Sequence, residues 1–258
     1  MVRDIHRNKE HFLSYIKSRT ESYEERARKL NQGEIKPDRI IPVKQNMAAN
    51  LIHILVSKYS LGIPIDELVD DFNPILNLIE ESWVHGSRKL IGPKHKVLNQ
   101  YNIDAHVQLL TILSIGFLCV ISKDFFIRLG KIINDDNVID ILFECILASK
   151  LNSWKMRQED DDYTFKLYSN LKKAILQSEK EEAEKLVKIF LERDWIKEQK
   201  KAQMLIEPNK SWYHGAWSFE SAAIVAILDL DDSSFRDNQY YPKDLVDYYR
   251  STLKGSPR

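Results

Sequence analysis

The sequence predicts an all-α protein with about ten or more helices. Apolar residues recur at three- and four-residue steps through most of the 258 residues, which is the spacing of one face of an α-helix. No alternating pattern of apolar and polar residues extends beyond about four residues, so no long strand is predicted. Eight glycines and eight prolines are few for a loop-rich β fold. Apolar residues form 43% of the chain, enough for an ordinary folded core.

The first predicted helices have recognisable ends. A long amphipathic helix is expected over residues 12–30, with Gly33 just past its end as a stop signal. The next is expected over residues 47–59 and is closed by Gly62. Pro74 begins a further helix, because proline is tolerated in the first turn of a helix and disfavoured inside it.

The middle of the chain contains the most apolar segment. Residues 89–99 are predicted to form a basic loop around Gly92 and Pro93. Asp104 is expected to cap a helix that runs to Ile121. The apolar run inside it covers about 13 residues, whereas a membrane-spanning helix needs about 20. We therefore expect a buried core helix here and no contact with a membrane.

The second half continues the helical spacing. Ser178 and Glu181 have the spacing of a capping box, in which each side chain bonds the backbone N–H of the other residue. Short connections favour antiparallel packing of neighbouring helices. We also expect two helical subdomains, residues 1–125 and 135–252, that share or abut one core. The further helices are expected over residues 124–133, 138–149, 163–176, 178–199 and 217–228, and from Pro242 onward.

Charge and cysteine content narrow the class of protein. The chain has 38 basic and 38 acidic residues, so its net charge favours neither a nucleic acid nor a membrane as a partner. Cys119 and Cys145 lie in apolar helical runs and are predicted to be reduced core residues. The N-terminus has no apolar signal segment. A cytoplasmic protein is predicted.

The sequence contains no recognised motif for catalysis or for metal binding. Its seven histidines are scattered, with no His-Glu-x-x-His or Cys-x-x-Cys pattern, and it has no Gly-x-Ser-x-Gly turn. His214 and Ser218 would share a helix face, but a capping role is the more typical one for such residues. We therefore predict no catalytic residue, no metal and no cofactor.

Glu220 is the carboxylate with the most unusual surroundings. It precedes a run of small apolar residues, where a carboxylate must find partners or change its pKa. One interpretation is a structural bond to Tyr240, Tyr241 or Arg236. The other is a general acid or base, and the corresponding alternative function is a helical metal-dependent hydrolase. Its carboxylates would be Glu220 together with the loop residues Asp229, Asp231 and Asp232.

The C-terminal part of the chain resembles a known family. Tyr213 and Gly215 precede Trp217-Ser218-Phe219-Glu220, and Ala222-Ala223 follows. The run continues with Asp231-Asp232-Ser233-Ser234 and Tyr240-Tyr241-Pro242-Lys243-Asp244-Leu245. These about forty residues resemble the C-terminal signature of PoNi proteins, the immunity proteins that neutralise PoNe-type bacterial DNase toxins. Ala216 and Lys243 depart from that pattern, and the first 130 residues resemble the family's N-terminal domain in length and helical character.

The resemblance implies an all-α protein without enzymatic activity that binds and inhibits a cognate DNase toxin in competition between bacteria. Signature residues are expected to hold the fold. They are Tyr213, Gly215, Trp217, Phe219, Glu220, Tyr241 and Pro242.

Two acidic stretches are the predicted toxin-binding surfaces. A nuclease keeps a positive groove for phosphates, and carboxylates with interleaved aromatic side chains can occupy such a groove. The predicted contacts are Asp229, Asp231, Asp232, Phe235, Asp237 and Tyr240, with a second contact at Glu159, Asp160, Asp161 and Asp162.

Overall fold

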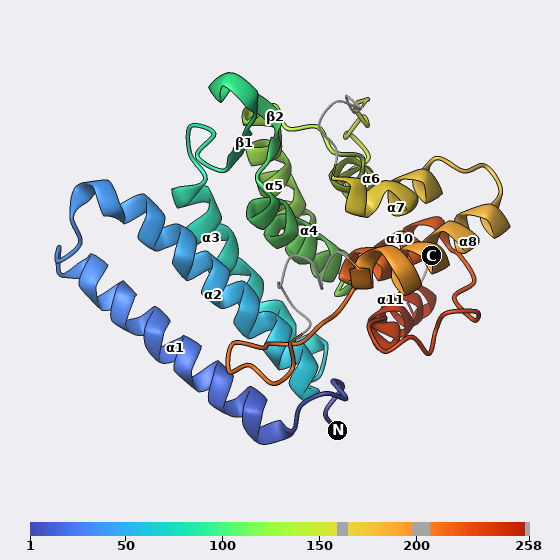
Figure 1. The fold of residues 1–258 in the computed structure, drawn as a ribbon, viewed down its shortest axis with the longest axis horizontal. Helices are drawn as coiled ribbons and strands as arrows, with labels where there is room; N and C mark the ends of the chain where they lie inside the picture. Colours follow the sequence, from blue (N-terminus) through green and yellow to red (C-terminus); the bar gives the residue numbers. More distant parts are fainter. Residues whose placement is uncertain (159–164, 198–206, 256–258) are drawn as a thin grey trace. The chain divides into compact units, whose positions relative to one another are not determined.

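The computed structural model describes residues 1–158, 165–197 and 207–255 and confirms the all-α class (Figure 1). Its contacts divide the chain into two compact units. The first unit consists of Met1–Arg88 and Glu207–Gly215, and the second of Lys89–Ile206 and Ala216–Arg258. The boundaries of these units differ from those of the predicted subdomains, 1–125 and 135–252. That each subdomain folds independently stays a prediction. In the part of the chain that is described, no helix is both long and apolar enough to cross a membrane.

Three helices form the body of the first unit. They are α1 (Lys9–Asn31), α2 (Ile40–Leu61) and α3 (Phe72–Ser82). α2 packs against both α1 and α3, and Figure 1 shows α1 and α2 side by side. The short 3-10 helices η1 (Pro37–Arg39) and η2 (Asp66–Asp71) connect them. Gly62 ends α2 at a φ of 94°, in the left-handed region, as its place in the sequence predicts.

The Glu207–Gly215 segment returns to the first unit and is fixed there by polar bonds. The Tyr213 hydroxyl donates to Oδ2 of buried Asp4 at 2.6 Å, and His11 Nε2 lies 2.7 Å from the Tyr213 carbonyl oxygen. The buried His214 ring stacks on His53 with 4.1 Å between the ring centroids. Gly215 follows at a φ of 115°, a conformation that glycine adopts without steric cost. These contacts explain why Tyr213 and Gly215 suit this position.

A β-hairpin opens the second unit, where the sequence predicted a basic loop. Strands β1 (Lys89–Ile91) and β2 (Val97–Tyr101) are antiparallel, with Lys89 opposite Tyr101. Leu98 and Gln100 are buried, while Val97 and Asn99 are exposed. This alternation of buried and exposed residues is too short to predict a strand from the sequence.

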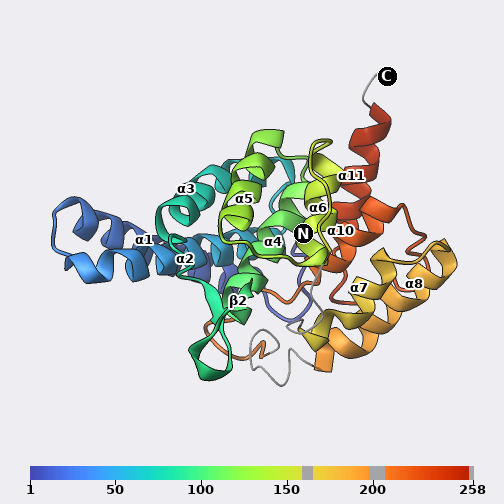
Figure 2. The ribbon, with the colours of Figure 1, turned by 90° about the horizontal axis from the view of Figure 1, so that it is seen from above.

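Helix α10 (Phe219–Leu228) is the centre of the second unit. Residues 219–226 are all buried, because the helix is apolar on every side and packs against five neighbours. These neighbours are α4 (Ile103–Leu118), α6 (Ile141–Lys150), α7 (Ser169–Ile175), α8 (Lys180–Ile189) and α11 (Lys243–Gly255). Helix α5 (Lys123–Asp135) packs on α6, and both views show α7 and α8 side by side (Figures 1 and 2). The remaining elements are the 3-10 helices η3 (Pro93–His95) and η5 (Lys166–Tyr168) and the π-helix η6 (Phe190–Trp195).

Several helix ends differ from the prediction. α4 is capped by the side chain of Asn102, which accepts from the Ala105 N–H, and the predicted cap Asp104 lies in its first turn. α8 begins at Lys180 without a side-chain cap, so the predicted capping box does not form. α6 begins after Asp140, whose carboxylate accepts from the Leu142 N–H. A capping residue must lie one position before the first helical turn, and spacing alone places that turn only within a few residues.

Candidate functional site

The acidic loop that follows α10 contains two adjacent aspartates in opposite environments. Asp232 is buried, with 4% of its surface exposed. Its carboxylate accepts from Arg236 Nη1 at 3.0 Å, Arg250 Nη1 at 3.2 Å and the Tyr241 hydroxyl at 3.1 Å. These bonds tie the loop to α11, so Asp232 has a structural place in this conformation. It offers almost no surface to a partner.

Two aromatic residues of the predicted contact surface are also buried. The Phe235 ring meets the Tyr241 ring edge-on, with 5.4 Å between the centroids. The Tyr240 ring packs on Trp195, with 5.0 Å between the centroids. Phe235 is 3% exposed and Tyr240 is 5% exposed. The aromatic residues of this loop therefore anchor it to the second unit.

The exposed carboxylates of the loop are Asp229, Asp231 and Asp237. Lys180 Nζ lies 2.9 Å from Asp229 Oδ2, and Lys243 Nζ lies 2.8 Å from Asp237 Oδ1. The bonds from these two lysines lower the pKa of each carboxyl group. Two of the three exposed carboxylates of this loop are thus neutralised by neighbouring lysines.

Asp231 differs because it has no ion-pair partner among the described residues. Its carboxylate accepts from the Ser233 hydroxyl at 2.7 Å and from the Ser233 N–H at 3.0 Å, and these bonds lower its pKa. Its own N–H donates to Glu184 Oε1 at 2.9 Å. Asp231 and Glu184 therefore form an acidic surface without a direct ion pair among the described residues, which we call the Asp231 surface. The second predicted contact, residues 159–162, lies outside the described part of the chain.

Glu220 lies at the start of α10, with 7% of its surface exposed. Burial raises its pKa to about 7, although the nearby Ser218 hydroxyl and Trp195 indole favour the ionised form. The predicted bonds from Arg236 and Tyr241 go to Asp232 instead. The sequence correctly indicated that Glu220 has unusual surroundings, but the partners predicted for it differ from those in the fold. Residues that are close in sequence are not always those that pack against each other.

No metal centre is apparent in residues 1–158, 165–197 and 207–255, where no group of three or more His, Cys, Asp or Glu residues is placed to hold an ion. The carboxylates of the alternative hydrolase do not converge on one site. Asp232 is held by two arginines, Asp229 is paired with Lys180, and Glu220 is buried beside Trp195.

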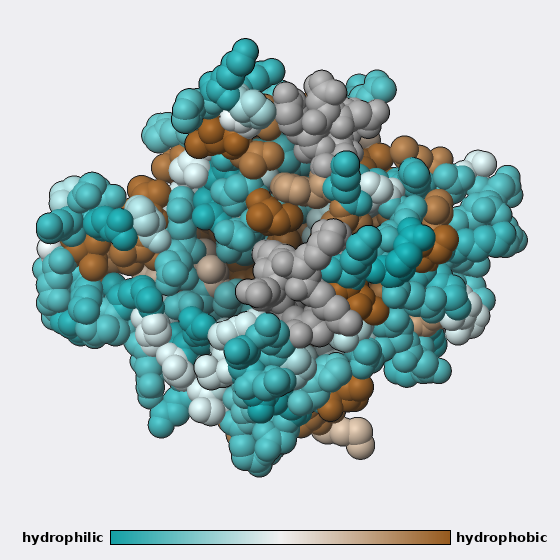
Figure 3. Space-filling view, viewed as in Figure 1, coloured by the Kyte–Doolittle hydropathy of each residue, from teal (hydrophilic) through white to brown (hydrophobic). Residues whose placement is uncertain are grey.

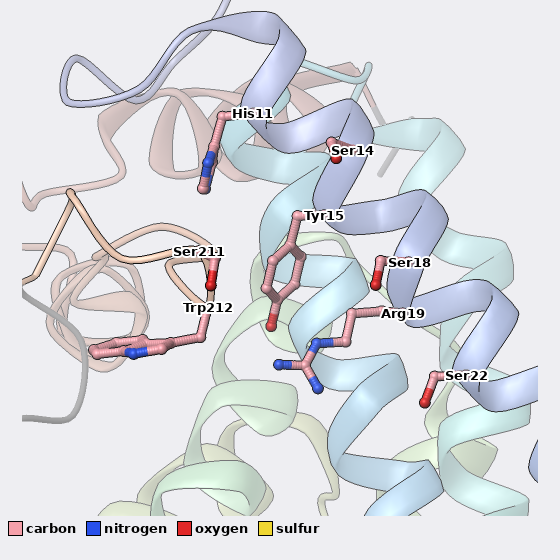
Figure 4. A pocket seen from close by; sticks show the side chains of 8 residues that line it. All are labelled: His11, Ser14, Tyr15, Ser18, Arg19, Ser22, Ser211 and Trp212. Atoms are coloured by element: carbon pink, nitrogen blue, oxygen red, sulfur yellow. The ribbon is translucent and has the colours of Figure 1, made fainter.

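A polar pocket of about 400 Å³ lies in the first unit, between α1 and the Glu207–Gly215 segment. Figure 4 shows Tyr15 and Arg19 pointing from α1 toward the loop that carries Ser211 and Trp212. This pocket was not predicted from the sequence. Ser14, Ser18 and Ser22 recur at four-residue steps on α1, and this hydroxyl stripe was the available signal. The full lining is His11, Ser14, Tyr15, Ser18, Arg19, Ser22, Ser211 and Trp212.

The surface of the molecule bears mainly hydrophilic residues on the face shown in Figure 3. The hydrophobic residues visible on that face form small separate groups.

Two family models match the chain. The model of PoNe immunity proteins (PoNi), N-terminal, matches residues 3–131, and the model of PoNe immunity proteins (PoNi), C-terminal, matches residues 138–245. The chain belongs to the PoNi family. PoNi proteins are immunity proteins for PoNe DNase toxins, so the resemblance of the C-terminal motifs is confirmed and extends over nearly the whole chain.

A solved structure supports the fold of this PoNi chain. The crystal structure of protein PA2201 from Pseudomonas aeruginosa is similar with a TM-score of 0.67 and 15% sequence identity. The match covers 98% of this chain and 92% of that one. No curated protein matches the sequence.

The PoNi signature residues from Trp217 onward lie in the second unit, whereas Tyr213 and Gly215 lie in the first. Phe219, Tyr241 and Pro242 are buried, and Trp217 is half-buried just before α10. The Ser218 N–H donates to the Tyr240 carbonyl oxygen at 2.8 Å, which joins the start of α10 to the segment that leads into α11.

Proposed function

We propose that this PoNi chain binds a cognate DNase toxin directly and inhibits it by occupying its DNA-binding groove, without catalysing a reaction. It would act in the cytoplasm of the bacterium that makes the toxin and of its kin. The observation that carries the proposal is the match of both PoNi family models, which together span residues 3–245 with one short gap.

The Asp231 surface is the proposed contact with the toxin's DNA-binding groove. A protein that binds DNA presents lysines and arginines to the phosphates. An exposed carboxylate without its own counter-ion is attracted to such a groove and accelerates association. Asp231 meets this condition, whereas Asp229 and Asp237 already pair with lysines.

Co-expression with the gene of a cognate PoNe toxin tests the function. Cells that make both proteins are expected to survive with intact DNA, and cells that make the toxin alone are expected to lose viability as their DNA is degraded. The purified proteins should elute together in size-exclusion chromatography. Equal killing with and without this chain would contradict the proposal.

The alternative, a metal-dependent hydrolase, has a separate test. Calorimetric titration with Mg²⁺ or Mn²⁺ should show no saturable binding if the chain acts by association alone. Binding that is lost in Glu220→Gln or Asp231→Asn would favour the hydrolase.

A further inference from the structure

The pocket between α1 and the Glu207–Gly215 segment contains a cation without an anionic partner. Arg19 lines the pocket and is half-buried. Its Nη1 donates to Asn50 Oδ1 at 3.2 Å, and its guanidinium lies 5.0 Å from the centre of the Tyr15 ring. These partners are neutral, and no carboxylate of the described residues forms an ion pair with Arg19.

The rest of the pocket does not compensate this charge. Among the described residues, its wall contains no aspartate or glutamate. Burial, with a smaller contribution from the charge of Arg19, lowers the pKa of nearby His214 to about 4. Burial is also the largest cause that lowers the pKa of His53, and the charges of His214 and Arg19 add to this effect. The His53–His214 pair is therefore neutral at pH 7, and Arg19 is the permanent charge of the pocket.

The remaining groups are suited to an oxygen-rich anion. Hydroxyl groups of Ser14, Ser18 and Ser211 are exposed at the wall and are available as hydrogen-bond donors. A guanidinium presents five N–H donors in a planar fork that matches both oxygens of a carboxylate. Trp212 adds an aromatic side chain to the lining on the side of the loop (Figure 4).

We propose that this pocket receives an aspartate or glutamate side chain of the cognate toxin, whose carboxylate pairs with Arg19. The inference rests on the proposed function and names a second contact with the same partner, of opposite charge to the Asp231 surface. The carboxylate displaces water from Arg19, and the serine hydroxyls bond its remaining oxygen lone pairs.

The composition of the pocket favours a side chain of a protein over a free metabolite. Sites for small molecules are mostly enclosed and apolar, whereas four of the eight residues that line this pocket are serines, and three of these are exposed. Arginine, tyrosine and tryptophan are the residues that contribute most to binding energy at protein interfaces. All three occur here within one pocket, as Arg19, Tyr15 and Trp212.

The Arg19 contact can be separated from a general charge effect by two variants of α1. Arg19→Met and Lys17→Met each remove one positive charge from the same helix. The Lys17 side chain is 79% exposed and lies outside the pocket lining. Binding of each purified full-length variant to the toxin is measured by calorimetry. Arg19→Met is expected to raise Kd by about tenfold or more, and Lys17→Met by less than about twofold.

A third variant protects the test against a loss of folding. Arg19 also bonds Asn50, so its removal can loosen α1. Ser18→Glu leaves Arg19 in place and supplies a carboxylate at an exposed position on the pocket wall. This carboxylate repels an incoming carboxylate at the pocket wall, and Kd is expected to rise by about tenfold or more while circular dichroism and Tm stay native.

The outcomes distinguish this inference from the function itself. If the wild-type chain does not bind the toxin, the proposed function fails. If it binds and the Arg19→Met and Ser18→Glu variants, both natively folded, bind with the same Kd as Lys17→Met, the pocket is not a contact and the inference is wrong. Restoration of Arg19→Glu binding by one Asp→Arg or Glu→Arg substitution on the toxin would identify the paired residue.

Discussion

At the scale of single residues, the adjacent pair Asp231 and Asp232 shows what a sequence leaves open. Both follow a buried helix, and the sequence predicts that both are exposed acidic residues. Only the fold brings Arg236, Arg250 and Tyr241 to Asp232 and leaves Asp231 in solvent. The most distant partner, Arg250, lies 18 residues away on α11, a separation at which spacing gives no information about contact.

The pair gives a matched prediction about stability. Asp232→Asn removes a buried negative charge that pairs with Arg236 and Arg250. Arg236 keeps its bond to Asp247, but Arg250 loses its carboxylate partner, so we expect the free energy of unfolding to fall by about 3 kcal/mol. Asp231→Asn changes an exposed side chain and should alter it by less than about 1 kcal/mol. Urea unfolding monitored by circular dichroism measures both. Equal losses in the two variants would show that Asp232 does not anchor the loop.

At the scale of elements, helix α10 could be predicted and its surroundings could not. The small apolar residues after Glu220 indicated a buried helix, and α10 is buried along most of its length. Its first turn begins two residues later than predicted, at Phe219, because Trp217 and Ser218 are held outside the helix by the bond from Ser218 to Tyr240. Such a contact depends on tertiary structure and leaves no periodic pattern in the sequence.

A second network at this scale was not predicted either. Buried Asp140 precedes α6 and accepts from Gln100 of β2, His106 of α4 and Lys172 of α7, each at 3.0 Å. Burial opposes its ionisation, but the charges and bonds of His106 and Lys172 hold its pKa below the usual range. Four elements thus meet at one carboxylate. The four residues span positions 100 to 172, and no local rule connects them.

The pKa of Glu220 gives a prediction about α10. Its folded value of about 7 lies above the ordinary 4.5, so the folded state keeps a proton that the unfolded chain releases. Stability from this group is present at low pH and is lost as pH rises through about 7. Glu220→Gln removes the titrating group and should avoid this loss. Between pH 5 and pH 8, the unfolding free energy of the variant should gain roughly 2 kcal/mol relative to the wild type.

Urea unfolding of both proteins at pH 5, 6, 7 and 8 measures this gain. The difference between the two proteins is the relevant quantity, because other titrating groups contribute equally to both. A difference that does not change with pH would show that Glu220 has an ordinary pKa and is solvated.

At the scale of the whole molecule, the class of protein was accessible from sequence and the interaction surface was only partly so. The Trp217-to-Leu245 motifs identified the PoNi family because they are specific as a string. The acidic surface was overestimated because counting carboxylates ignores their partners. Lys180 and Lys243 neutralise Asp229 and Asp237, and the fold buries Asp232. The pocket around Arg19 was missed because it requires residues from α1 and from positions 211 and 212 together.

Charge reversal at Asp231 tests how the whole molecule recognises its toxin. Asp231→Lys replaces an exposed carboxylate with a cation and should slow association with the toxin severalfold at low salt, because steering toward a basic groove is lost. The effect should shrink as salt is added, since the screening length falls to about 8 Å at 0.15 M. Asp124→Lys is the matched control, with a 72% exposed side chain on α5. Stopped-flow measurement across a salt series separates the two variants. Identical association rates for both reversals would mean that Asp231 contributes only to net charge, and the toxin-binding surface would then have to lie elsewhere on the molecule.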